Sequence, residues 1–170
     1  MAVQSGVLNR APSTYQEWID CFAYIRSHPN DRAYLAKLSD GSFYGDSQML
    51  DMYLHRLDDT LREMISARIT RFLAQIDELF AENDLDGVEV LSARFCRDIS
   101  ACFFFRELSG IPQKQKTEFA DGFSGQLQQF WSRLIREMKL QAEEHRNDEL
   151  EELAFRLARL NGEWNRKGRQ

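Results

Sequence analysis

The sequence predicts an all-α protein, an elongated helical bundle of five or six helices in which two or three amphipathic helices are long. The first observation is a stretch, residues 47–83, that contains no glycine or proline and carries one apolar stripe. Two further helical stretches follow it, and no strand-like alternation of apolar and polar residues competes with them. Because apolar stripes are stable only when other elements cover them, we expect these helices to pack as a bundle.

Length and composition favour a single globular domain. The chain has 170 residues, of which 43% are hydrophobic and 29% are charged, and this is enough apolar material for one core. We expect a flexible lead over residues 1–13, a helical domain over residues 14–165 and a basic tail over residues 166–170.

Cysteine usage and hydropathy predict a cytoplasmic protein. The three cysteines, Cys21, Cys96 and Cys102, cannot all pair within one chain, and the last two lie in an apolar helical stretch. This pattern favours a reducing compartment. No apolar run approaches the roughly 18 residues that a membrane span needs, so we expect no membrane contact.

Capping signals locate the first two helices. Thr14 and Glu17 have the spacing of a capping box, in which both side chains satisfy amide groups at a helix start. The helix must end before Pro29, because the residue that precedes a proline avoids helical geometry. Asn30 or Asp31 then caps a short second helix, whose apolar residues are Tyr34, Leu35 and Leu38.

The long stretch over residues 47–83 should form one helix, on the order of 55 Å in length. Turn-forming residues at 83–87 end it. At about 100° per residue, its apolar side chains fall on one face: Leu50, Leu54, Leu57, Leu61, Met64, Ile65, Ile69, Phe72, Ile76, Leu79 and Phe80.

Three more apolar stripes follow. The first covers residues 88–108 and ends at the Ser-Gly-Ile-Pro sequence of residues 109–112. A second stripe covers residues 119–138, and a polar stretch separates it from a third stripe at residues 150–164. Because the third stripe points in another direction, we expect either a break near Asn147 or one helix with two different neighbours.

The last stripe is the strongest candidate for a partner-binding surface. No other stripe in the sequence is an obvious mate for it, and heptad-like stripes pair readily with other helices. We therefore expect residues 148–165 to form a separately capped helix that docks onto a second copy of the chain or onto another protein. The contact residues would be Leu153, Leu157, Leu160 and Trp164.

Phe104 is a further candidate. It belongs to the apolar run Cys102-Phe103-Phe104-Phe105, and on a continuous helix it would point nearly opposite to the stripe of residues 88–108. The conservative interpretation is that another helix covers it, since large apolar side chains are usually inside. The functional interpretation is an aromatic anchor for a partner protein.

Arg68 interrupts the apolar stripe of the long helix. Its stem can lie along apolar surface while the guanidinium reaches water. The sharper alternative is a buried polar contact, either with an acidic residue of another helix or with a ligand in a groove of the bundle.

Catalytic and metal-binding motifs are missing from the sequence. It has no Cys-x-x-Cys, no His-Glu-x-x-His and no Gly-x-Ser-x-Gly, and its cysteines lie among bulky apolar residues that disfavour the reactive thiolate. We therefore predict no catalytic residues, no metal site and no cofactor, and a protein that is not an enzyme. An enzyme with a site assembled from distant residues in a bundle groove is the third possibility.

Together these features predict a non-enzymatic protein–protein interaction module, such as an adaptor, a chaperone-like factor, an inhibitor or a small subunit, acting on a protein partner or as a homo-oligomer. Net charge is −5, and residues 1–84 hold 8 basic against 13 acidic side chains, which disfavours general nucleic-acid binding. The alternative is a helical accessory factor of a nucleic-acid-processing complex. Its phosphate contacts would be Arg133, Arg136, Arg156, Arg159, Arg166, Lys167 and Arg169.

Overall fold

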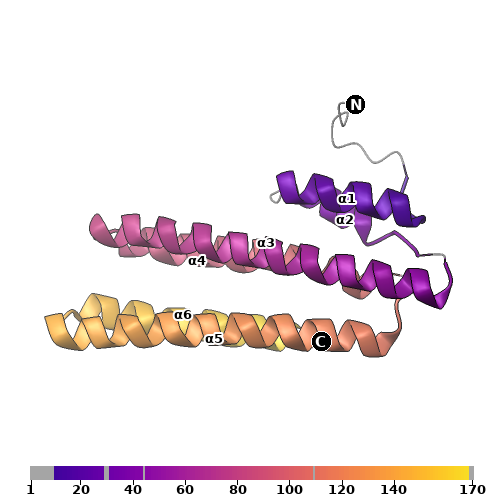
Figure 1. The fold of residues 1–170 in the computed structure, drawn as a ribbon. Helices are drawn as coiled ribbons and strands as arrows, with labels where there is room; N and C mark the ends of the chain where they lie inside the picture. Colours follow the sequence, from indigo (N-terminus) through magenta and orange to yellow (C-terminus); the bar gives the residue numbers. More distant parts are fainter. Residues whose placement is uncertain (1–9, 29–30, 44, 109, 169–170) are drawn as a thin grey trace. The chain divides into compact units, whose positions relative to one another are not determined.

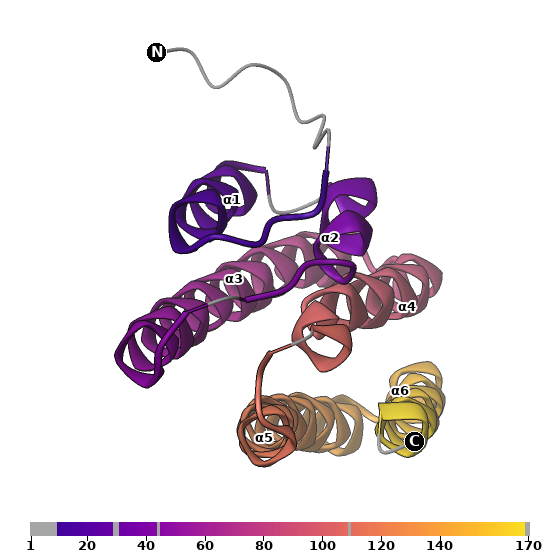
Figure 2. The ribbon, with the colours of Figure 1, turned by 90° about the vertical axis from the view of Figure 1, so that its right-hand side faces the viewer.

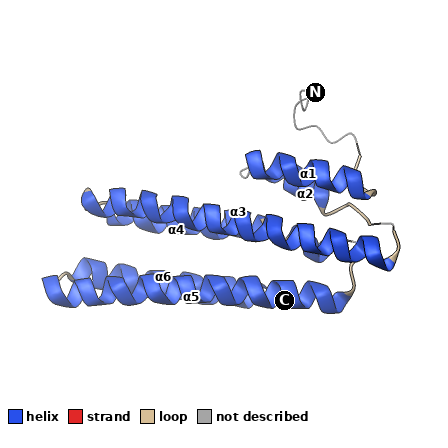
Figure 3. Ribbon diagram, in the orientation of Figure 1, coloured by secondary structure: helices blue, strands red, loops and turns tan. Residues whose placement is uncertain are grey.

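The computed structural model describes residues 10–28, 31–43, 45–108 and 110–168, with side chains as far as Glu163. Over these residues the chain forms six α-helices and one short 3₁₀ helix and no β-strand, which confirms the all-α class (Figures 1 and 3). The two longest helices have 35 and 33 residues. The elements are α1 (Tyr15–Ser27), α2 (Arg32–Leu38), α3 (Ser47–Ala81), α4 (Leu85–Ala101), η1 (Phe104–Glu107), α5 (Gln113–His145) and α6 (Asp148–Gly168).

The described residues divide into two compact units, a division that the sequence analysis did not anticipate. Unit 1 draws on Met1–Arg68 and Asp98–Ala120, and unit 2 draws on Ile69–Arg97 and Asp121–Gln170. Helices α3, α4 and α5 therefore each contribute one part to each unit, whereas α1 and α2 belong to unit 1 and α6 belongs to unit 2.

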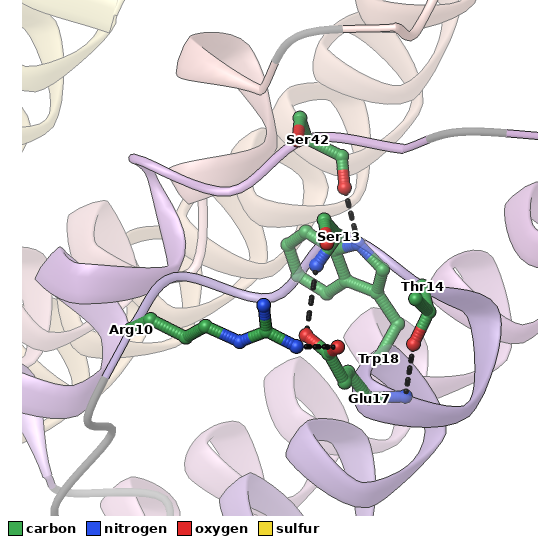
Figure 4. Close-up of polar contacts among 6 residues, drawn as sticks. All are labelled: Arg10, Ser13, Thr14, Glu17, Trp18 and Ser42. Atoms are coloured by element: carbon green, nitrogen blue, oxygen red, sulfur yellow. Dashed lines mark hydrogen bonds and ion pairs between the residues drawn. The ribbon is translucent and has the colours of Figure 1, made fainter.

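Helix α1 of unit 1 begins with the predicted capping residues (Figure 4). The Thr14 hydroxyl accepts a hydrogen bond from the Glu17 amide at 3.3 Å. The Glu17 carboxylate accepts one from the Ser13 amide at 3.1 Å and pairs with Arg10 at 2.6 Å. In an ideal capping box the carboxylate would bond to the N-cap amide, so this helix start is a close variant of it.

An aromatic cluster of Trp18, Phe22, Phe43 and Tyr53 forms the centre of unit 1. Tyr53 lies against the other three rings, with centroid separations of 4.6 to 6.0 Å. The indole N–H of Trp18 donates to the Ser42 carbonyl at 2.8 Å (Figure 4), as a buried indole requires. This bond fixes the chain after α2 against α1.

Charged side chains at the edge of unit 1 connect its helices. Arg26 of α1 lies 3.0 Å from Glu63 of α3 and donates to the Thr60 hydroxyl at 3.1 Å. Arg32 of α2 pairs with Asp98 of α4 at 2.8 Å. These pairs are partly exposed and contribute little free energy, about 0–1 kcal/mol each, so they orient helices that apolar burial holds together.

The end of α4 differs from the prediction. The helix stops at Ala101, not near Leu108, and the chain continues through a turn into η1, which begins at Phe104. The expectation that Phe104 points away from the core is therefore wrong, because that expectation assumed a continuous helix. Phe104 is buried with only 6% of its surface exposed, in agreement with the conservative interpretation.

Unit 2 is a four-helix bundle in which each helix contacts two neighbours. The rings of Phe72 in α3 and Phe95 in α4 are 4.4 Å apart, and both rings lie 5.7 Å from Trp131 of α5. Figures 1 and 2 both show α5 and α6 side by side. Helix α6 completes the ring of helices through an ion pair with α4 and a cation–π contact with α5.

Two tight turns join the helices of unit 2 into hairpins. Between α3 and α4, Asn83 adopts a φ of 55° and Asp84 accepts a hydrogen bond from the Gly87 amide at 2.9 Å. This cap starts α4 at Leu85, three residues before the predicted start. Between α5 and α6, Arg146 has a φ of 50° and the Asn147 side chain caps α6, so the break predicted near Asn147 is confirmed.

The apolar stripe of α6 packs inside unit 2. Leu150, Leu153, Ala154 and Leu157 are all buried. The expectation that this stripe lacks a mate within the chain is therefore wrong. The stripe changes direction because the chain reverses at Asn147, so α6 approaches the same bundle from a new side.

We predict that Gly41→Ala destabilises unit 1. A Cβ atom at this position would lie 2.5 Å from Trp18 Cζ2 and 2.9 Å from the Leu38 carbonyl oxygen, so the ring or the backbone must move. The free energy of unfolding should fall by about 1–3 kcal/mol. Denaturant unfolding followed by circular dichroism measures the change.

Gly122→Ala is the matched control, because Gly122 lies within α5 with open space around its Cα. This substitution should raise the free energy of unfolding by about 0.5–1 kcal/mol through helix propensity. Equal effects from the two variants would contradict the packing described for Trp18.

Candidate functional site: a groove between α4 and α6

The candidate site is an open groove on unit 2 between α4 and α6, with a volume of about 220 Å³. Most of its surface is apolar, and charged side chains of both signs stand at its edges. The residues that line it are Glu89, Ala93, Arg156, Leu157, Arg159, Leu160 and Glu163.

Helical periodicity places these residues together. Glu89 and Ala93 are one turn apart on α4, so both face α6. On α6, Leu157 and Leu160 form the apolar floor with Ala93. Leu157 is fully buried and belongs to the core, whereas Leu160 and Ala93 are half-buried and remain accessible. The groove is thus the outer border of the same stripe that anchors α6.

The charges at the edge of the groove are balanced, with two acidic and two basic side chains. Arg156 Nε lies 3.0 Å from Glu89 Oε2 across the groove, without the alignment of a good hydrogen bond. Both side chains are about 40% exposed, so the pair sets the spacing of α4 and α6 more than it stabilises them. Arg159 and Glu163 are exposed, and neither belongs to an ion pair among the described side chains.

The groove suits protein side chains better than a small molecule. Its 220 Å³ is below the roughly 300–1,000 Å³ of typical small-molecule pockets. An apolar floor between two helices with charged edges is the geometry into which a third helix places its apolar side chains.

The predicted partner-binding residues fall into three groups. Leu157 and Leu160 line the groove, with Leu160 accessible. Leu153 is fully buried in unit 2 and Phe104 is buried in unit 1, so neither faces outward. Trp164 lies outside the described side chains.

The residues predicted for the nucleic-acid alternative are also divided. Arg133 and Arg136 are exposed, one turn apart on α5. Arg156 and Arg159 line the groove, where Glu89 already neutralises Arg156. The side chains of Arg166, Lys167 and Arg169 lie outside the described part of the structure.

Two exposed apolar side chains on the α5–α6 hairpin were missed by the sequence analysis. Leu140 and Phe155 are each 58% exposed. The Lys139 ammonium lies 5.2 Å from the centroid of the Phe155 ring, a distance at which a cation–π contact is favourable. Both residues lie off the apolar stripes of their helices, and this position is a signal that helical counting would have found.

Arg68 is buried, with 7% of its surface exposed, and the prediction of a guanidinium that reaches water is wrong. Its Nε and Nη2 atoms have no hydrogen-bond partner, and Arg68 belongs to no ion pair among the described residues. The thiol of Cys102 is close enough for the arginine charge to favour its thiolate form. Arg68 is thus a charge that burial leaves uncompensated.

The cysteines are poor nucleophiles. Burial raises the pKa of Cys102 to about 11, although the neighbouring Arg68 opposes the shift. Burial also raises the pKa of Cys96 to about 11 and raises the pKa of Cys21. The thiolate is the reactive form, so none of the three is activated near neutral pH.

Wider searches add no competing site. Within the part of the chain that the structure describes, no group of three or more His, Cys, Asp or Glu side chains is arranged to hold a metal ion. Over the same residues, no helix is both long enough and apolar enough to cross a membrane. Comparison with family models, curated proteins and solved structures gives no match in any of the three.

We predict that Arg68→Met raises the free energy of unfolding by about 1–3 kcal/mol, because it removes unsatisfied buried donors and keeps the apolar stem. Arg26→Met is the control, since its guanidinium has partners in Thr60 and Glu63. That change should lower stability by at most about 1 kcal/mol. If Arg68→Met were the more damaging substitution, the guanidinium would have to have a partner.

Stability should also decrease with alkaline pH. The unfolded chain releases the protons of Cys96 and Cys102 near pH 9, whereas the folded chain holds them until about pH 11, so stability is lost between these values. From about pH 8 to about pH 10 the two thiols should lower the free energy of unfolding by about 1–2 kcal/mol. A Cys96→Ala/Cys102→Ala variant should show a smaller decrease in denaturant unfolding. An identical pH dependence in both proteins would contradict the burial of these thiols.

Proposed function

We propose that this chain is a non-enzymatic protein–protein interaction module that binds an amphipathic helix of a partner protein in the groove between α4 and α6. The observation that carries the proposal is the accessible apolar floor of Ala93 and Leu160, bordered by charges of both signs. Helix-in-groove recognition needs an apolar recess for the anchoring side chains and a polar edge that fixes their register.

The balanced charge at the edge favours a protein partner over a phosphate backbone. Glu89 and Glu163 would lie beside any anionic chain in the groove, and Glu89 already pairs with Arg156. A partner helix with side chains of both signs can instead pair with Arg159 and Glu163. Like-charge contacts of the kind a phosphate backbone would make are the usual means by which a protein rejects a wrong partner.

Nucleic-acid binding remains the second candidate because Arg133 and Arg136 are exposed on one side of α5. This pair can contact phosphates without using the groove. Such binding would be independent of sequence and strongly weakened by salt.

The test is an Ala93→Arg substitution compared with Ser132→Arg. Ala93 is a half-buried part of the groove floor, whereas Ser132 is an exposed residue of α5 in the same unit. Both variants add one positive charge, but only Ala93→Arg fills the groove. A photoreactive side chain at Leu160 should form an adduct with a partner protein in cells, and Ala93→Arg should remove this adduct while Ser132→Arg retains it.

Circular dichroism shows that each variant is folded before the adducts are compared. An adduct between two copies of the chain would identify the partner as a second copy. An adduct that survives Ala93→Arg unchanged would count against the groove. Nucleic-acid binding that both added arginines strengthen would favour the second candidate, because phosphate contacts depend on charge and not on groove shape.

A further inference from the structure

Unit 1 carries a second groove, which lies along the first half of α3 and the first turns of α5 and has a volume of about 450 Å³. None of its residues belongs to unit 2, so it is separate from the groove of the proposed function. The residues that line it are Asp51, Leu54, His55, Asp58, Arg62, Gln115, Glu118 and Phe119.

The α3 side of this groove is a continuous face of the helix. Its lining positions recur at intervals of three and four residues from Asp51 to Arg62, which is one side of an α-helix. Leu57 and Leu61, on the opposite border of this face, are fully buried in the core. The groove therefore follows the helix axis for about three turns, and this is the shape that a second helix needs.

The floor of the groove is apolar. Leu54 contributes from α3 and Phe119 contributes from α5. The Phe119 ring stands edge-on to Phe105 with centroids 5.9 Å apart, so it is supported from behind. Met52, on the adjoining shoulder of α3, is 52% exposed, and a methionine side chain adapts readily to different apolar partners.

The charge around this floor is predominantly negative. Arg62 is paired with Asp58 at 2.9 Å, and His55 lies 3.6 Å from Asp59. Asp51 and Glu118 belong to no ion pair among the described residues, and they stand on the two opposite helices. The groove thus offers two available carboxylates on either side of an apolar floor.

We propose that this groove binds a basic amphipathic helix from a partner protein. The apolar face of that helix would contact Leu54 and Phe119, and its lysine or arginine side chains would pair with Asp51 and Glu118. Charge complementarity commits the groove to this occupant, since acidic helices and nucleic acids would be repelled. The pattern of apolar anchors with flanking cations is that of a basic amphipathic helix.

The test uses the full chain and synthetic peptides with an amphipathic helical repeat of leucine and lysine. Binding is followed by isothermal titration calorimetry. The groove variant is Asp51→Asn/Glu118→Gln, and its control is Asp77→Asn/Glu78→Gln. Asp77 and Glu78 are exposed acids of α3 outside the groove, so both variants lose the same net charge.

We expect the leucine–lysine peptide to bind the wild type and the control alike, and to bind the groove variant about tenfold more weakly, as two exposed ion pairs allow. A serine–lysine peptide of the same charge should bind much more weakly than the leucine–lysine peptide, because it lacks the apolar face. The proposal is overturned if the two variants weaken binding equally, if the serine–lysine peptide binds as well, or if neither peptide binds. A leucine–glutamate peptide that bound with the same affinity would also overturn it.

Discussion

Unit 2 depends on the burial of α6 against its own bundle. Leu150, Leu153, Ala154 and Leu157 turn inward, and the chain reversal at Asn147 directs them there. Full burial of a leucine side chain is worth about 1.5–3 kcal/mol, far more than the exposed pair between Arg156 and Glu89. Apolar burial therefore fixes α6, and the ion pair only adjusts its spacing from α4. The candidate groove exists because this stripe is wider than the core that it fills.

The same division between burial and charge separates the two grooves. In unit 2, acidic and basic side chains alternate around Ala93 and Leu160, so the groove has no strong preference for one sign of charge. In unit 1, Asp58 neutralises Arg62 and leaves Asp51 and Glu118 available, so the groove favours cations. Each apolar floor supplies affinity, and the surrounding charges select the partner.

Local signals in the sequence predicted much of the fold. Thr14, Asp31 and Asn147 all cap helices as their residue types suggest, since capping depends on neighbours within four residues. The end of α4 was missed because Ile99, Cys102 and Phe105 keep a three-residue spacing that fits a 3₁₀ turn as well as a helix. The mate of α6 was missed for a different reason. Glu89 and Arg156 are far apart in sequence, and no local pattern records their contact.

Hydrogen–deuterium exchange of the dilute full-length chain tests the central claim, that α6 is part of the core of unit 2. Amides from Leu153 to Leu157 should exchange as slowly as those around Trp131 in α5, and their protection should not depend on protein concentration. Rapid exchange throughout α6 in the dilute chain would contradict the account. So would protection that appears only at high concentration, because α6 would then be buried by a second copy of the chain.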